Sequence, residues 1–147
     1  GSLPEFSGIL NFYMLWKLFQ SKWTAIGWTI FIFILMLLPP GSLPKRGIFG
    51  VPNLDKLVHI VMFGGFVWLW YYSRNTESKT RGLLFRLVLI SAVYGISMEF
   101  VQENFTNRRF DIWDVVADIS GAALVWIWIT KWGQKVSPYG NRGRNQN

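Results

Sequence analysis

Four long apolar runs constrain this chain more than any other feature of its sequence. They cover residues 23–38, 57–73, 83–102 and 113–130. Each run has about 16 to 20 residues, so as a helix it would span roughly 24 to 30 Å, close to the thickness of a hydrocarbon core. Spanning segments are helices or closed barrels, and four runs are too few for a barrel. The runs therefore predict an all-α membrane protein with a bundle of four transmembrane helices.

Composition agrees with this class of protein. Charged residues make up 16% and hydrophobic residues 51% of the chain, whereas a soluble domain carries roughly 25% charged residues. The first run could instead be a cleaved signal sequence, but residues 39–42 (PPGS) offer no small-x-small cleavage site, so we expect this helix to remain. The sequence contains no cysteine, which excludes disulfides and thiolate chemistry.

Lysine and arginine residues sort unevenly between alternate loops. One side carries Lys17, Lys22, Arg74, Lys79, Arg81, Lys131, Lys135, Arg142 and Arg144; the other carries Lys45, Arg46, Lys56, Arg108 and Arg109. Positive residues stay preferentially in the cytoplasm, so we expect both termini there, in a multi-pass membrane protein. The loops over residues 39–54 and 103–110 then face outward.

The chain divides into three predicted parts. Residues 1–22 begin with a Gly1-Ser2 pair typical of a cloning remnant, and they either lie along the interface or extend the first helix. Residues 23–132 form the transmembrane domain, and residues 133–147 form a basic polar tail. The net charge is +7, and we expect the excess basic residues to contact membrane lipids and not nucleic acid. Oligomerisation is left open.

Polar residues near the predicted outer ends of the helices need a separate explanation. Asp55 and His59 are four residues apart and share a helix face. Asp55 is either the N-cap of its helix or part of a site. His59 either donates to a backbone carbonyl or takes part in function.

The third and fourth helices carry further acidic groups. Glu99 and Gln102 share one face at the end of the third helix. Asp111 is a plausible N-cap of the fourth helix, and Asp114 and Asp118 follow at spacings of three and four. Capping does not explain Asp118, which lies roughly 10 Å along the helix, where an ionised carboxylate needs a partner. The small residues after Asp118 permit close helix packing, which would bring it to a neighbour.

The predicted topology places these groups together, so we expect an outward-facing polar site. Its primary members are Asp55, His59, Glu99, Gln102, Arg109 and Asp114, and its secondary members are Lys56, Arg108, Asp111 and Asp118. His59, Glu99 and Asp114 together could ligate a metal. Because the sequence has no compact ligand motif such as H-E-x-x-H, we expect neither a metal nor a cofactor, and we assign no catalytic residue.

An ordered set of short motifs runs through the helices. It consists of Asp55-Lys56-x-x-His59 with Phe63, Gly95-x-x-x-Glu99-x-x-Gln102, and Arg109-x-x-x-x-Asp114 with Gly121. This succession resembles that of VanZ-like membrane proteins, over about residues 30–130. The resemblance implies a small bacterial membrane protein linked to resistance to glycopeptide antibiotics, teicoplanin in particular. The resemblance leads us to expect Asn at position 118, and Asp118 departs from it.

Three functions are compatible with this sequence. The first is a non-enzymatic protein that binds or excludes a lipidated antibiotic at the outer leaflet, with Arg108 and Arg109 holding an anionic head group. The second is an intramembrane enzyme acting on a lipid-linked envelope precursor, with His59, Glu99 and Asp114 as acid and base groups. The third is a proton-coupled transporter that uses Glu99 and Asp118 as relay groups. We favour the first.

Overall fold

The predicted apolar runs form four helices in a computed structural model, which describes residues 14–38, 54–74 and 81–133. The helices are α2 (Lys22–Met36), α3 (Leu54–Tyr72), α4 (Arg81–Phe105) and α5 (Ile112–Lys131). No strand occurs among these residues, which confirms the all-α prediction. Most of the predicted outer loop at 39–54, and nearly all of the polar tail, lie outside the described residues.

Side chains that accept from the first turn set the starts of two helices. Ser21 Oγ accepts from the backbone N–H of Trp23 at the start of α2. Asp111 Oδ1 accepts from the N–H of Trp113 at 2.8 Å, so the predicted N-cap of α5 is confirmed. Asp55 is the second residue of α3, within its first turn, which removes the N-cap alternative for this residue.

A short helical segment over residues 14–19 precedes α2. It ends at a turn at Gln20, and Ser21 then caps a new helix. Residues 14–19 are therefore separate from α2 and do not extend it in one piece. Residues 1–13, the first part of the predicted N-terminal segment, lie outside the described residues.

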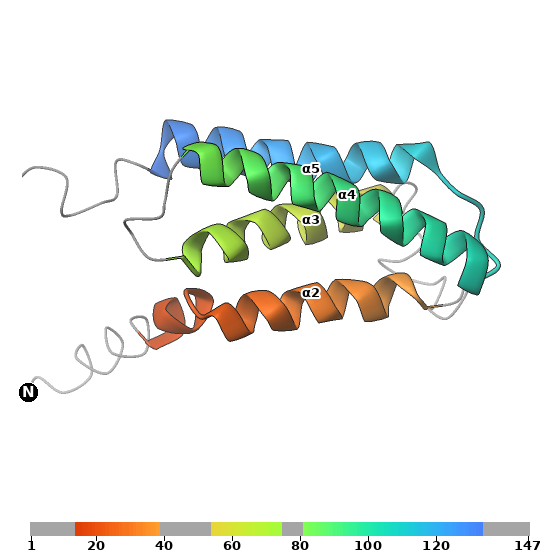
Figure 1. Cartoon of the computed structure of the whole chain (residues 1–147), viewed down its shortest axis with the longest axis horizontal. Coiled ribbons are helices and arrows are strands. Elements are labelled where there is room, and N and C mark those ends of the chain that lie inside the picture. The colour runs from red at the N-terminus through yellow and green to blue at the C-terminus, as the bar shows by residue number, and fades with distance from the viewer. Residues whose placement is uncertain (1–13, 39–53, 75–80, 134–147) are drawn as a thin grey trace, which may run out of the picture.

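The four helices run alternately up and down along one axis (Figure 1). α3 packs most extensively on α5, and it also contacts α4 and α2. α2 packs mainly on α3 and only slightly on α4. The start of α3, the end of α4 and the start of α5 meet at one end of the bundle, whereas the first and last described residues lie at the other (Figure 1).

Glycines allow α3 and α5 to approach closely. A Cβ atom added to Gly121 would collide with the backbone carbonyl oxygen of Ile60, and one added to Gly64 would lie 3.2 Å from the carbonyl oxygen of Gly121. Small residues at a helix contact permit this backbone approach, as the sequence after Asp118 predicted. The contact holds the N-terminal halves of α3 and α5 next to each other.

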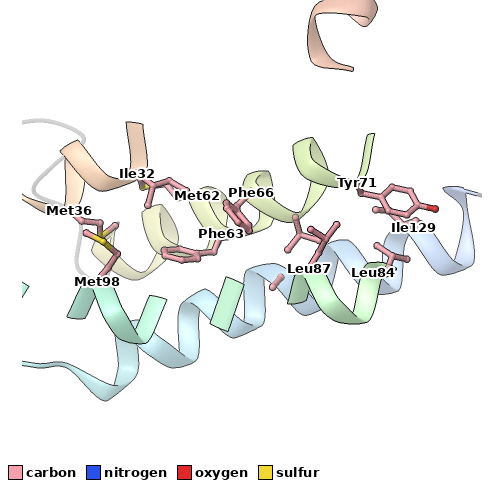
Figure 2. Close-up of a cluster of buried hydrophobic side chains, with 12 residues drawn as sticks. Ile32, Met36, Met62, Phe63, Phe66, Tyr71, Leu84, Leu87, Met98 and Ile129 are labelled. Carbon is pink, nitrogen blue, oxygen red and sulfur yellow. The ribbon is translucent and has the colours of Figure 1, made fainter. Parts of the chain in front are cut away.

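An apolar core runs along the bundle between the helices (Figure 2). Phe63, near the middle of α3, is fully buried. Met36, Met62 and Met98 contribute flexible side chains from three different helices. The flexible thioether side chain of methionine fills irregular space between helices.

Large apolar side chains also cover the outside of the bundle. Exposed examples from the four helices are Ile30, Ile34, Leu57, Val61, Leu89, Val93, Leu124 and Ile127. By length and composition, α4 and α5 are the described helices able to cross a membrane, and α2 is a shorter apolar helix. Only 33% of the most apolar window of α4 and 39% of that of α5 is buried, unlike the core helices of a soluble protein. Two of the four predicted spans therefore have this support.

Candidate functional site

Polar side chains from three helices meet at one end of the bundle. The polar cluster, as we call it, consists of Asp55, Lys56, His59, Glu99, Arg108, Asp111, Asp114 and Asp118. The helical spacings of three and four place its α3 and α5 members on facing sides of these helices. The close α3–α5 contact then brings the two sets into reach.

Asp114 is the centre of the polar cluster. Its Oδ1 accepts from Lys56 Nζ at 3.1 Å, and its Oδ2 lies 3.7 Å from both Arg108 Nη2 and His59 Nε2. The side chain of Asp114 is 2% exposed, so its charge is withdrawn from water. Such a buried carboxylate needs compensating charges, and the two cations supply them.

His59 and Asp118 form a buried pair one turn deeper. His59 Nδ1 lies 2.8 Å from Asp118 Oδ1, and both side chains are at most 2% exposed. An ionised carboxylate can only accept, so it holds the proton of the imidazole on Nδ1. Nε2 then faces Asp114 from beyond hydrogen-bond distance. Asp118 therefore has the partner that its predicted depth required.

Glu99 joins the polar cluster from α4. Its Oε2 accepts from the backbone N–H of Asp111 at 3.1 Å, while its Oε1 is buried and has no hydrogen-bond partner among the residues that the structure describes. Asp118 Oδ2 is likewise buried with no partner in the described ranges, and a Cβ atom on Gly95 would collide with it. The glycine at position 95 thus leaves the room that the Asp118 carboxylate occupies.

The polar cluster has a partly exposed rim and a buried interior. Side-chain exposure is 52% for Asp55, 41% for Asp111, 33% for Lys56 and 27% for Arg108, whereas the other members are buried. At the rim, the N–H of Trp113 and the ammonium of Lys56 stabilise the ionised form of Asp111, so the pKa of its carboxyl lies below the ordinary value. The cations lie at the rim, and the acid groups without neutralising partners lie inside.

Two residues that the sequence assigned to the site lie apart from the polar cluster. Gln102 is buried, but its Nε2 donates to the carbonyl oxygen of Met36 at 2.9 Å and so joins α4 to the end of α2. Arg109 is exposed. Its neighbour Arg108 takes the ionic contacts, with Nη2 at 3.1 Å from Asp55 Oδ2. The two arginines are adjacent in a non-helical segment, so the sequence alone does not indicate which of them forms the ionic contacts.

The geometry brings together an imidazole, five carboxyl groups and two permanent cations. Nε2 of His59 is oriented by Asp118 and is free to accept a proton or bind a ligand. Lys56 and Arg108 are accessible from the rim and can exchange their carboxylate partners for a ligand group. The same end can therefore hold a polar head group or carry acid and base groups.

Fold and site together define an all-helical protein with a largely apolar surface and a buried, acid-rich polar cluster at one end. The chain belongs to the VanZ/LLP1 family, whose family model matches residues 4–132. The resemblance inferred from the ordered motifs is therefore confirmed. Family membership and the two long apolar helices point to a membrane location.

A eukaryotic protein is among the relatives of this chain. The uncharacterized protein C11E3.10 of Schizosaccharomyces pombe is 30% identical over 93 residues, which are 63% of this chain and 57% of that protein. The alignment thus spans little more than half of the relative's length, and the relative's name assigns it no activity. No solved structure matches the chain significantly. A bacterial origin and a role in teicoplanin resistance stay predictions.

Proposed function

We propose that this chain is a multi-pass protein of a bacterial cytoplasmic membrane, with four spans and both termini in the cytoplasm. The described residues support this orientation through Lys17, Lys22, Arg74, Arg81 and Lys131, which belong to helix ends opposite the polar cluster (Figure 1). The polar cluster then lies at the outer boundary.

Aromatic residues fit the same placement. The rings of Trp68 and Trp128 lie 4.7 Å apart toward the basic end, and Trp113 lies at the polar end with 64% of its surface exposed. Indole rings favour the headgroup region on both sides of a membrane. α2 has 15 residues and would span about 22 Å, so its crossing requires local thinning of the bilayer or flanking residues.

The polar cluster, in this proposal, binds the polar head of an amphiphilic ligand in the outer leaflet. The observation that carries this function is the ionic rim of Lys56 and Arg108 beside exposed apolar residues of α3 and α5. Leu57 and Val61 are 54% and 57% exposed, and Ile112 is 57% exposed. A ligand with a polar head and an acyl chain can contact both kinds of surface at once.

A lipidated glycopeptide of the teicoplanin type is the ligand class that we infer. Its acyl chain distinguishes it from vancomycin, which has none, and the exposed apolar residues beside the rim are suited to such a chain. Exposed Arg109 is available to hold a carboxylate of the ligand. Binding would withhold the antibiotic from its target without any covalent reaction.

Drug susceptibility in a sensitive host tests this function. We expect the wild type to raise the inhibitory concentration of teicoplanin more than that of vancomycin. His59→Gln and Glu99→Gln should abolish the difference, because they change the buried groups on which the rim depends. Glu103→Gln changes an exposed carboxylate of α4 at the same end and should retain the wild-type profile. Membrane expression of all four proteins is measured in parallel.

Unchanged susceptibility to both drugs on expression of the wild type would contradict the proposed function. Equal protection against teicoplanin and vancomycin would contradict the role of the acyl chain. Loss of protection in Glu103→Gln as well would indicate a general sensitivity to charge at this end, and not a site.

One observation favours a second function, an intramembrane enzyme acting on a lipid-linked envelope precursor. The Asp118 carboxylate orients His59 so that Nε2 can serve as a general base beside Asp114. Mass spectrometry of lipid extracts separates this function from binding. An enzyme predicts a lipid species that is consumed in cells with the wild type and persists with His59→Gln, whereas a binding protein predicts identical lipid profiles.

A further inference from the structure

Three ligand-type atoms at the rim and interior of the polar cluster converge on one point. Oxygen or nitrogen atoms of Asp55, His59 and Asp114 all lie within 4.8 Å of one another. His59 Nε2 and Asp114 Oδ2 are 3.7 Å apart, too far for a hydrogen bond. Donors about 2.0 to 2.2 Å from a shared Zn²⁺ ion would be roughly 3.3 to 3.6 Å apart in a tetrahedral arrangement, so this pair already has nearly the required separation.

Asp118 completes an arrangement that is common around metal-binding histidines. Asp118 Oδ1 lies 2.8 Å from Nδ1, so in the neutral imidazole with its proton on Nδ1 the lone pair of Nε2 is on the side of Asp114. Metal-ligating histidines generally donate their other ring N–H to a carboxylate or carbonyl group, which fixes tautomer and orientation. Asp118 is therefore placed to orient His59 as a metal ligand.

An independent observation comes from Glu99. Glu99 is 1% exposed, and Oε1 has no hydrogen-bond partner among the described residues, although the charges of Asp114 and His59 act on this carboxylate. Within the part of the chain that the structure describes, the polar cluster contains five carboxyl groups against two permanent cations. Unbalanced buried charge is costly in a medium of low dielectric constant. A bound cation would offset the excess of negative charge and would lower the cost of the unpartnered Glu99 oxygen.

We propose that Asp55, His59 and Asp114 bind a divalent metal ion of the Zn²⁺ or Mn²⁺ type. An imidazole suits Zn²⁺ and carboxylates suit Mn²⁺, so a mixed set selects ions of this kind over Mg²⁺ or Ca²⁺. This site departs from the sequence-based expectation of no metal, because Asp55 from the preceding turn of α3, not Glu99, completes the ligand set.

Arg108 gives the inference a distinctive consequence. Its Nη2 lies 3.1 Å from Asp55 Oδ2 and 3.7 Å from Asp114 Oδ2, so the guanidinium bridges two of the proposed ligands. Arginine and metal ion therefore compete for the same pair of carboxylates. Removing the arginine charge should tighten metal binding, which a merely destabilising substitution would not do.

Equilibrium dialysis of the full chain in detergent micelles, first stripped with a chelator, tests the site. The probes are Zn²⁺ alone and Mn²⁺ alone, with metal content read by mass spectrometry. We expect saturable binding of one ion per chain. Asp55→Asn and Asp114→Asn should weaken binding by about tenfold or more, Arg108→Gln should tighten it, and Glu103→Gln should leave it unchanged.

Asp55 is half exposed, so its substitution keeps the test independent of folding even if Asp114→Asn unfolds the chain. Circular dichroism confirms helical structure in each variant. Absence of saturable binding in the wild type would overturn the inference, as would equal affinity in wild type and Asp55→Asn. Neither antibiotic nor lipid precursor enters the experiment, so its outcome is separate from that of the proposed function.

Discussion

At the scale of single residues, Asp118 determines how His59 is held. The 2.8 Å contact between Asp118 Oδ1 and His59 Nδ1 is buried, so no water replaces a lost partner. Asp118→Ala should therefore lower the free energy of unfolding by about 1 to 3 kcal/mol. Asp118→Asn keeps an accepting oxygen and should lower it by less. Denaturant unfolding in detergent distinguishes the two, and equal losses would show that the Nδ1 contact is not what stabilises this region.

Asp111 couples the start of α5 to pH. The N–H of Trp113 and the Lys56 ammonium hold the pKa of its carboxyl below the ordinary value of about 3.8. The resulting stabilisation is complete above that ordinary value and is lost as pH falls through the lowered pKa of the folded state. The side chain is 41% exposed, so screening keeps the effect small.

Asp111→Asn retains a capping oxygen but does not titrate. We expect the stability of the wild type to fall more steeply than that of Asp111→Asn below about pH 4, and the two curves to run parallel between pH 5 and 7. Thermal unfolding across this pH range provides the comparison. Parallel curves down to pH 3 would contradict the assigned contacts of Asp111.

At the scale of elements, the contact between α3 and α5 builds the polar cluster. A methyl group on Gly121 would meet the backbone carbonyl of Ile60, which cannot rotate away. Gly121→Ala should therefore destabilise the protein by about 1 to 3 kcal/mol despite the better helix propensity of alanine. It should also move His59 away from Asp118, because both lie close to this contact.

Gly27→Ala is the matched control within α2. Nothing lies within 4 Å of a Cβ atom added there, so the substitution should leave stability unchanged or raise it by up to about 1 kcal/mol. Unfolding of the two variants in the same detergent measures the difference. Equal stability of the two variants would mean that the α3–α5 approach is looser than described.

Much of this architecture follows from the sequence, because apolar run length and helical spacing are local properties. They placed the four helices to within a few residues, and they put Asp55 with His59, and Asp114 with Asp118, on shared faces. The partner that each side chain takes depends on tertiary structure. Gln102 turns to Met36 because the last carbonyls of α2 lack partners within their own helix.

Asp55 illustrates the same limit. Its position at a helix entrance suits a cap, but α3 begins at Leu54, and Asp55 instead accepts from Arg108 across a sequence separation of 53 residues. A pattern within one helix cannot reveal such a contact. The close approach of α3 and α5, which depends on Gly121 and Gly64, is what selects it.

At the scale of the whole molecule, the proposed topology has both termini on the cytoplasmic side. The chain has no native cysteine, so single cysteines report position without background. In intact cells, a membrane-impermeant maleimide should label Glu103→Cys, at the polar end, but not Lys131→Cys, at the basic end. Permeabilised cells should allow labelling of both. Labelling of Lys131→Cys alone in intact cells would invert the orientation and place the polar cluster inside.

Direct binding of teicoplanin to the protein in lipid nanodiscs tests the central claim, that the polar cluster and its apolar surroundings form one site for an amphiphile. Calorimetric titration should show teicoplanin binding to the wild type at least about tenfold more tightly than vancomycin, a difference of about 1.4 kcal/mol. His59→Gln should lose this preference and Glu103→Gln should keep it. Binding of teicoplanin with equal affinity to wild type and His59→Gln, or no binding above that of empty nanodiscs, would contradict the account.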